Sequence, residues 1–158
     1  MQEALAAVNK MRADEGKALL ADLAANGQAV EQFLNKISKR APEVSAAYQA
    51  RLQQRVNKSL TELSVTVDPT DLLRELSLFV DRSDVSEEVV RLRSHLQQFA
   101  EALQLSESSG RKLEFIVQEM GREVNTIGSK ANDAEISRYV IEIKSALERI
   151  REQIQNVE

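Results

Sequence analysis

Residues 134–158 read AEISRYVIEIKSALERIREQIQNVE, with an apolar residue at every third or fourth position. These positions are Ile136, Val140, Ile143, Leu147, Ile150, Ile154 and Val157. Spacings that alternate between four and three place the side chains on one face of an α-helix, whereas a half-buried strand alternates every second residue. A repeat of this length predicts a long helix that packs against other helices.

The same period is present in the first third of the chain. One stripe comprises Leu20, Leu23, Gly27, Val30, Leu34 and Ile37. Asn26-Gly27 is a common turn dipeptide, but the stripe continues across it, so we expect one long helix here. Proline fits a first helical turn and disfavours helix in the residue before it, so Ala41-Pro42 predicts the end of this helix. Residues 44–63 repeat the apolar period and are predicted to fold back as the second arm of a hairpin.

Capping and turn signals divide the remaining residues into further helices. An extended link is predicted at residues 65–67 and a loop at residues 106–110. Helices are predicted to start at Asp68-Pro69, after Asp84 with Glu87 three residues later, and after Asn132 with Glu135 three residues later. Gly128 is predicted to end a helix. An Asp or Asn followed three residues later by Glu resembles a capping box, and a glycine often follows the last turn of a helix.

The predicted fold is therefore all-α. Residues 1–64 are expected to form a long, coiled-coil-like helical hairpin, and residues 65–158 a bundle of about four helices. The mixture of 42% hydrophobic, 29% charged and only 4% aromatic residues agrees with packed helices rather than with sheets.

The composition also excludes several kinds of site. The chain has 158 residues, no cysteine, one histidine and a formal net charge of −4. Without cysteine it holds no disulfide, thiol nucleophile or thiolate zinc site, and the remaining oxygen-rich ligands favour Mg²⁺ or Mn²⁺. No apolar run reaches the roughly 18 residues of a membrane span, so we expect a soluble protein that is not exported. The negative charge argues against coating of nucleic acid by bulk electrostatics.

One group of candidate functional residues follows the predicted cap at residue 84. Asp84, Glu88, Arg91 and His95 are spaced four, three and four residues apart, so they share one stripe, apart from the apolar face. Histidine titrates near neutral pH and is suited to proton transfer. An ordinary solvated helix face explains the same pattern, and both interpretations remain open at this stage.

A second group lies on the helix that follows Gly110. Arg111, Glu114, Gln118, Arg122 and Asn125 share one face, and Glu119 and Glu123 share the next. Arginine and amide side chains at this spacing can contact phosphates and base edges, and two carboxylates four residues apart can hold a divalent cation. Lys130 follows in a glycine-containing connection before another helix start, where backbone amides attract anions. Solvated helix faces and an ordinary capped connection are the alternatives.

Several longer segments resemble one protein family. Residues 110–136, GRKLEFIVQEMGREVNTIGSKANDAEI, and residues 150–158, IREQIQNVE, resemble the C-terminal domain of the YicC/YloC-type endoribonuclease family. Residues 81–99, DRSDVSEEVVRLRSHLQQF, are similar to the family segment D-R-S-D-I-S-E-E-x-x-R-L-x-S-H. Residues 9–23, NKMRADEGKALLADL, resemble R-x-x-E-G-x-x-L-x-x-D-L. At Gly121 the chain departs from the family's usual asparagine in Q-E-M-N-R-E.

The resemblance implies a cytoplasmic bacterial endoribonuclease that requires a divalent cation, Mg²⁺ or Mn²⁺, and acts on single-stranded or small structured RNA. It implies a ring-like homo-oligomer, a hexamer, without membrane association. It also implies that a further N-terminal domain precedes the position of Met1, so that the chain corresponds to the C-terminal part of a longer enzyme.

The resemblance also suggests roles for matching positions. Expected catalytic residues are His95, Glu119, Arg122 and Glu123; expected metal ligands are Asp84, Glu88, Glu119 and Glu123; and expected RNA contacts are Arg82, Arg91, Arg111, Lys112, Gln118, Asn125 and Lys130. One histidine per chain means that an acid–base pair of two histidines would require a second subunit. The alternatives to an enzyme are an RNA-binding adaptor and an oligomeric helical scaffold.

Overall fold

The computed structural model describes residues 2–63, 69–105 and 110–155, and each secondary-structure element within them is an α-helix. The elements are α1 (Gln2–Leu63), α2 (Pro69–Ser83), α3 (Ser86–Gln104), α4 (Gly110–Lys130) and α5 (Ala134–Gln155). The predicted all-α fold is confirmed. The extended link predicted at residues 65–67 lies outside the described residues, as do residues 106–109 of the predicted loop, whereas Gly110 begins α4.

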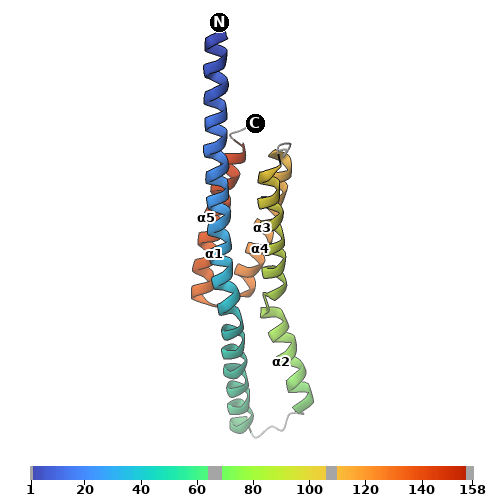
Figure 1. The fold of residues 1–158 in the computed structure, drawn as a ribbon. Helices are drawn as coiled ribbons and strands as arrows, with labels where there is room; N and C mark the ends of the chain where they lie inside the picture. Colours follow the sequence, from blue (N-terminus) through green and yellow to red (C-terminus); the bar gives the residue numbers. More distant parts are fainter. Residues whose placement is uncertain (1, 64–68, 106–109, 156–158) are drawn as a thin grey trace.

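The core of the molecule is an antiparallel four-helix bundle (Figure 1). Helix α1 packs on α5 and α3, and α4 packs on the same two helices from the other side. Leu34, Leu92, Met120 and Ile143, one from each helix, are fully buried in this core. The predicted bundle of about four helices is therefore present, but α1 takes the place expected for α2. Helix α2 instead lies beside the lower part of α1 (Figure 1).

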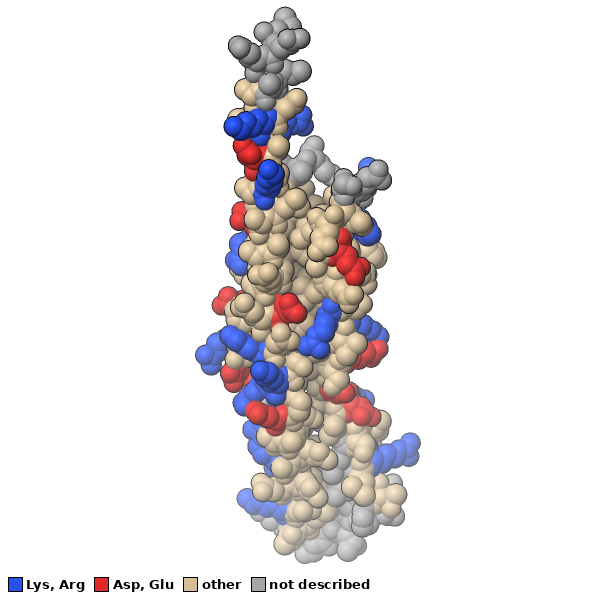
Figure 2. Space-filling view, viewed as in Figure 1, with Lys and Arg blue, Asp and Glu red and all other residues tan. Residues whose placement is uncertain are grey.

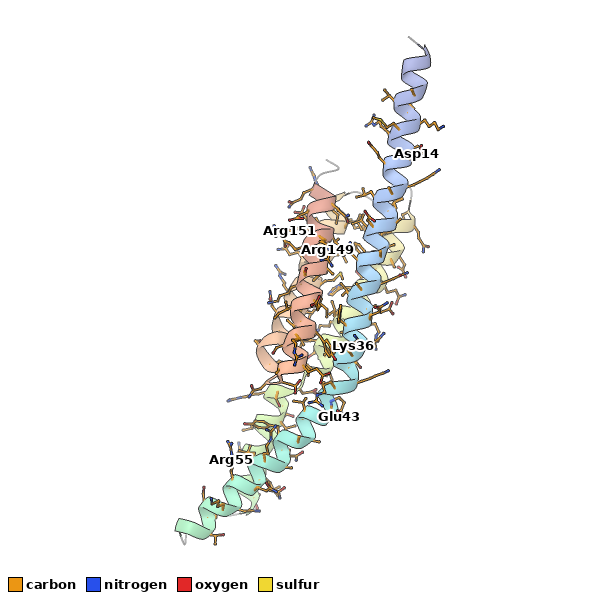
Figure 3. All side chains as sticks on the ribbon, turned by 90° about the vertical axis from the view of Figure 1, so that its left-hand side faces the viewer. Asp14, Lys36, Glu43, Arg55, Arg149 and Arg151 are labelled. Carbon is orange, nitrogen blue, oxygen red and sulfur yellow. The ribbon has the colours of Figure 1, made fainter. Side chains whose placement is uncertain are left out.

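The predicted hairpin turn at Pro42 is wrong, because α1 continues through this residue as one helix of 62 residues. Pro42 removes one helical hydrogen bond and crowds the preceding turn, which costs about 3 kcal/mol in a helix interior. Tertiary packing opposes this cost: Ile37 is fully buried, and Ala41 and Val44 pack against the core. Figure 3 shows α1 changing direction near Glu43, as expected for a proline inside a helix.

Two glycines mark close helix contacts. A Cβ atom at Gly27 would lie 3.3 Å from Cε1 of Phe99, so the phenyl ring of α3 rests on the backbone of α1. The Asn26-Gly27 dipeptide accordingly does not break α1, as expected. Gly128 was predicted to end its helix, but α4 continues to Lys130. A Cβ atom at Gly128 would lie only 3.1 Å from Cγ1 of Val140, so this glycine allows α4 and α5 to approach each other.

The N-terminus of α5 is capped by Asp133 rather than by the predicted Asn132. Oδ1 of Asp133 accepts hydrogen bonds from the backbone N–H groups of Glu135 and Ile136, both at 3.0 Å. Its Oδ2 accepts a hydrogen bond of 3.2 Å from Nη2 of Arg40 on α1. The hydrogen bond from the N–H of Ile136 is the main cause that lowers the pKa of Asp133, and Arg40 adds to it. A single carboxylate thus starts α5 and ties it to α1.

Helix α1 extends beyond the bundle at both ends (Figure 1). Its first turns form an arm that carries the exposed side chains of Val8 and Met11. Figure 2 shows both basic and acidic side chains along this arm. Its last turns run alongside α2 at the opposite end. As far as the structure describes them, none of the helices combines the length and apolar character needed to cross a bilayer.

Candidate functional site

The two motif segments, residues 81–99 and 110–133, meet along the interface of α3 and α4. These helices are antiparallel, and among the described residues charged side chains of α3 and α4 meet in two pairs, Glu88 with Lys130 and Arg91 with Glu123. We call this line of residues the α3–α4 seam; it comprises Glu88, Arg91 and His95 on one side and Glu119, Glu123 and Lys130 on the other.

At one end of the seam, Glu88 is a buried carboxylate with a single cationic partner. Only 4% of the surface of Glu88 is exposed, and Nζ of Lys130 donates a hydrogen bond of 2.6 Å to its Oε1. The same ammonium group donates to the backbone carbonyl of Asp84 at 3.2 Å. Oε2 of Glu88 is buried and accepts no hydrogen bond from the described residues. One oxygen of this buried carboxylate is therefore paired and the other is not, which is uncommon in a protein interior.

The middle of the seam is a chain of charge pairs. Arg91 forms an ion pair with Glu87 on its own helix, and its Nη1 lies 3.9 Å from Oε1 of Glu123 on α4. Arg122 donates a hydrogen bond of 2.7 Å to Glu119. Glu119 and Glu123 are both half-buried, while the arginines are exposed. Glu119 therefore lies beside Arg122 and Glu123 beside Arg91, and a different positive group could replace either arginine as the partner of the carboxylate.

His95 occupies the next turn of the seam. It follows Arg91 by four residues, and Glu119 precedes Glu123 by four, so the antiparallel register places His95 at the level of Glu119. The imidazole is half-buried. By this register three of the predicted catalytic residues, His95, Glu119 and Glu123, lie along one interface, and His95 forms no hydrogen bond or ion pair with the described residues.

Asp84 lies at the start of this region but has a different role from the predicted capping box. Its Oδ1 accepts hydrogen bonds from the N–H of Ser86 at 2.9 Å and from its hydroxyl at 2.6 Å. The hydroxyl bond is the largest cause that lowers the pKa of Asp84. Helix α3 begins at Ser86, and the predicted partner Glu87 pairs with Arg91 instead. The predicted reciprocal box is therefore wrong, and Asp84 holds the turn that leads into α3.

The predicted metal ligands do not gather into one compact group. Within the parts of the chain that the structure describes, no three His, Asp or Glu residues are close enough to hold a metal ion together. The donor chemistry still fits a hard cation, because the seam supplies carboxylate oxygens. Oε2 of buried Glu88 is a carboxylate oxygen without a hydrogen-bond partner among the described residues, although Lys130 already pairs with Oε1 of the same group.

The predicted RNA contacts do not form one group: Arg91 and Lys130 belong to the α3–α4 seam, and the others lie outside it. Gln118, Arg122 and Asn125 line a groove between α4 and α5, which we call the α4–α5 groove. Arg111 and Lys112 are exposed in the first turn of α4, about 28 Å along the helix from Lys130 at its end. Arg82 is exposed in the last turn of α2, near the Lys130 end. The structure therefore places the side-chain amides of Gln118 and Asn125 beside Arg122, whereas the cations of α2 and of the first turn of α4 lie elsewhere.

The α4–α5 groove also contains two cationic residues that lie outside the sequence motifs. Lys144 and Arg151 of α5 form its other side, and Gly121 lies in its wall, where a Cβ atom would meet nothing within 4 Å. Figure 3 shows Arg151 and Arg149 on opposite sides of α5. Arg149 faces α1, where its Nε donates to Asn26. The seven-residue spacing of Lys144 and Arg151, outside the apolar stripe, was the signal in the sequence.

The chain is similar to proteins of one described family. Residues 37–158 match the family "Endoribonuclease YicC-like, C-terminal". Over 158 residues the chain is 39% identical to "Probable endoribonuclease YicC" of Clostridioides difficile, covering 100% of the chain and 54% of that protein. Over 151 residues it is 34% identical to the protein of the same name from Haemophilus influenzae, covering 94% of the chain and 50% of the relative. The chain thus spans about half the length of these curated relatives.

Proposed function

We propose that the chain, which belongs to the family of endoribonuclease YicC-like C-terminal domains, takes part in hydrolysis of phosphodiester bonds within RNA. The observation that carries this proposal is the α3–α4 seam. Two segments distant in the sequence converge there and align His95 with two half-buried carboxylates, Glu119 and Glu123. General acid–base groups and cations at one interface are what cleavage of a phosphodiester requires.

In this proposal His95 and the two arginines have different roles in cleavage. His95 transfers a proton to or from the reacting oxygens, since an imidazole has one nitrogen that can donate a proton and one that can accept it. Arg122 and Arg91 neutralise the phosphate, and both are exposed and paired with carboxylates they can release. Exposed ion pairs of this kind contribute roughly 0–1 kcal/mol, so exchanging a glutamate for a phosphate costs little.

We further propose that cleavage requires a divalent cation, Mg²⁺ or Mn²⁺. Glu119 and Glu123, one turn apart on α4, would hold it. The other two expected ligands, Glu88 and Asp84, lie together at the Lys130 end of the seam, and no three carboxylates of the described residues are close enough to share one ion. A bound cation would polarise the phosphate and lower the pKa of a coordinated water. The half-buried state of Glu119 and Glu123 and their carboxylate oxygens, which suit a hard cation, support this assignment. Cytoplasmic location and a ring-like homo-oligomer belong to the same proposal and rest on the resemblance.

A cleavage assay with labelled RNA tests the proposal. Because the chain spans about half the length of its curated relatives, the assay uses the full gene product as well as residues 1–158. We expect cleavage with Mg²⁺ or Mn²⁺ and none with EDTA. Cleavage that continues in EDTA would reject the metal requirement. RNA binding with a steep salt dependence but no cleavage would identify an adaptor, and neither activity would identify a scaffold.

A further inference from the structure

Phe115 is the exposed aromatic residue among those whose side chains the structure describes, with 61% of its surface open to solvent. The other described aromatic rings have partners or cover. Phe99 is buried in the core, and the rings of Phe33 and Tyr139 lie 6.0 Å apart beneath Lys36. Phe115 therefore departs from the pattern of the other described rings, and its position on α4 decides whether that exposure has a use.

The position of Phe115 on α4 relates it to both candidate sites. Arg111 lies four residues before it, Gln118 three residues after and Arg122 seven residues after, so all of them share one exposed stripe. Glu119, one turn beyond the ring, belongs to the α3–α4 seam. Gln118 and Arg122 line the α4–α5 groove. Phe115 therefore stands on the ridge of α4 between the seam and the groove.

The groove beside this ridge carries groups that suit a phosphate backbone. Lys144 and Arg151 on the α5 side form no hydrogen bond or ion pair with the described residues. The amides of Gln118 and Asn125 add further donors on the α4 side. Three cations and two carboxylates, Glu114 and Glu148, line the groove, so charge alone supplies little affinity. Stacking on an aromatic ring adds affinity that does not depend on net charge.

We infer that Phe115 is a stacking platform for an unpaired RNA base, while the backbone of the same strand follows the α4–α5 groove. This inference rests on the proposed function, because it deepens the contact with RNA. The ring accepts a base only when its face is free, so the site selects single-stranded segments over duplex. A base held on the ridge brings the adjoining phosphate toward Arg122 and the seam. Stacking also explains how a chain with a net charge of −4 holds RNA.

The first test is binding of a fluorescent single-stranded oligoribonucleotide, measured in EDTA so that cleavage plays no part. Phe115→Ala is expected to weaken binding about 5- to 150-fold, which corresponds to the loss of one stacked base. Phe115→Leu keeps an apolar side chain without a ring and is expected to bind as weakly. The control is Val90→Ala on α3, which removes a comparably exposed apolar side chain and is expected to bind like the wild type.

The second test uses the absence of tryptophan from the chain. The Phe115→Trp variant gains a single indole, whose emission is expected to be quenched by the oligoribonucleotide. Inorganic polyphosphate offers charge without bases and is expected to leave the emission unchanged. Quenching by both ligands alike would overturn the stacking inference.

The outcomes separate the inference from the proposed function. If the wild type fails to bind RNA, the proposed function fails and the inference with it. If the wild type binds and Phe115→Ala binds equally well, only the stacking inference is wrong. If Phe115→Ala changes the molecular mass measured by sedimentation and leaves RNA affinity unchanged, the ring is a contact between copies of the chain, and the inference is again wrong.

Discussion

Nζ of Lys130 lies 2.6 Å from Oε1 of Glu88, joining the last turn of α4 to the first turn of α3. This contact links residues 42 positions apart and fixes the register of the α3–α4 seam. The ammonium group compensates a buried carboxylate, which is costly to leave unpaired. The position of the remaining seam residues relative to each other depends on this register.

Lys130→Met is expected to lower the free energy of unfolding by about 1–3 kcal/mol, because buried Glu88 then loses its charged partner. Urea denaturation followed by circular dichroism measures the change. The double variant Glu88→Leu with Lys130→Met removes both charges and is expected to be more stable than Lys130→Met alone. Equal stability of the wild type and Lys130→Met would show that the pair does not stabilise the register.

Glycine-to-alanine substitutions at two helix positions are expected to have opposite effects. Gly121→Ala should raise the free energy of unfolding by about 1 kcal/mol, because alanine favours helix and the new Cβ meets nothing within 4 Å. Gly27→Ala should lower it, since the Cβ would press against the buried ring of Phe99 at 3.3 Å. Thermal melts of the two variants beside the wild type make the comparison. A stabilising Gly27→Ala would mean that the ring can move away.

Pro42→Ala is expected to stabilise α1 by about 1–3 kcal/mol. Alanine restores a helical N–H and removes the clash of the proline ring, although it also loosens the unfolded chain. Urea denaturation measures the gain. A loss of stability in Pro42→Ala would show instead that the bend of α1 near Glu43 is needed for α1 to pack both on the bundle and on α2.

Asp133 gives the fold a predictable dependence on pH. Because its folded pKa is lowered, its contribution is present above the ordinary pKa of about 4 and is lost as pH falls through the folded value. Asp133→Asn keeps an oxygen for the cap but loses the charge opposite Arg40. The free energy of unfolding of Asp133→Asn should be lower than that of the wild type by about 1 kcal/mol at pH 7, and the difference should shrink at acid pH. A constant difference from pH 7 to pH 2 would contradict this account.

Local periodicity predicts the helices of this chain, because the spacing that puts Ile136 and Ile143 on one face can be read from a single helix without knowing its neighbours. It fails at Pro42, where packing of Ile37 and Val44 against distant helices outweighs the local preference. The cap of α5 is Asp133, one residue after the predicted Asn132, since both side chains suit a cap and only the backbone geometry distinguishes them.

The candidate site shows the same division between local and distant information. Spacing alone places Glu88, Arg91 and His95 on one side of α3. Which acid meets which cation depends on the register of α3 against α4, and the spacing within one helix carries no information about it. The pairing of Glu88 with Lys130, and the contribution of Lys144 to a groove, therefore emerge only from the fold.

The central claim is that the α3–α4 seam supports RNA cleavage, and the most direct test is the rate at which labelled RNA is cut by the double variant Glu119→Gln with Glu123→Gln. The matched control is Glu142→Gln with Glu152→Gln, which removes two exposed carboxylates of α5. With Mn²⁺ present, the account predicts a loss of about a hundredfold or more in the seam variant, with RNA affinity and helix content unchanged, and a wild-type rate in the control. A seam variant that cleaves RNA at the wild-type rate would contradict the account.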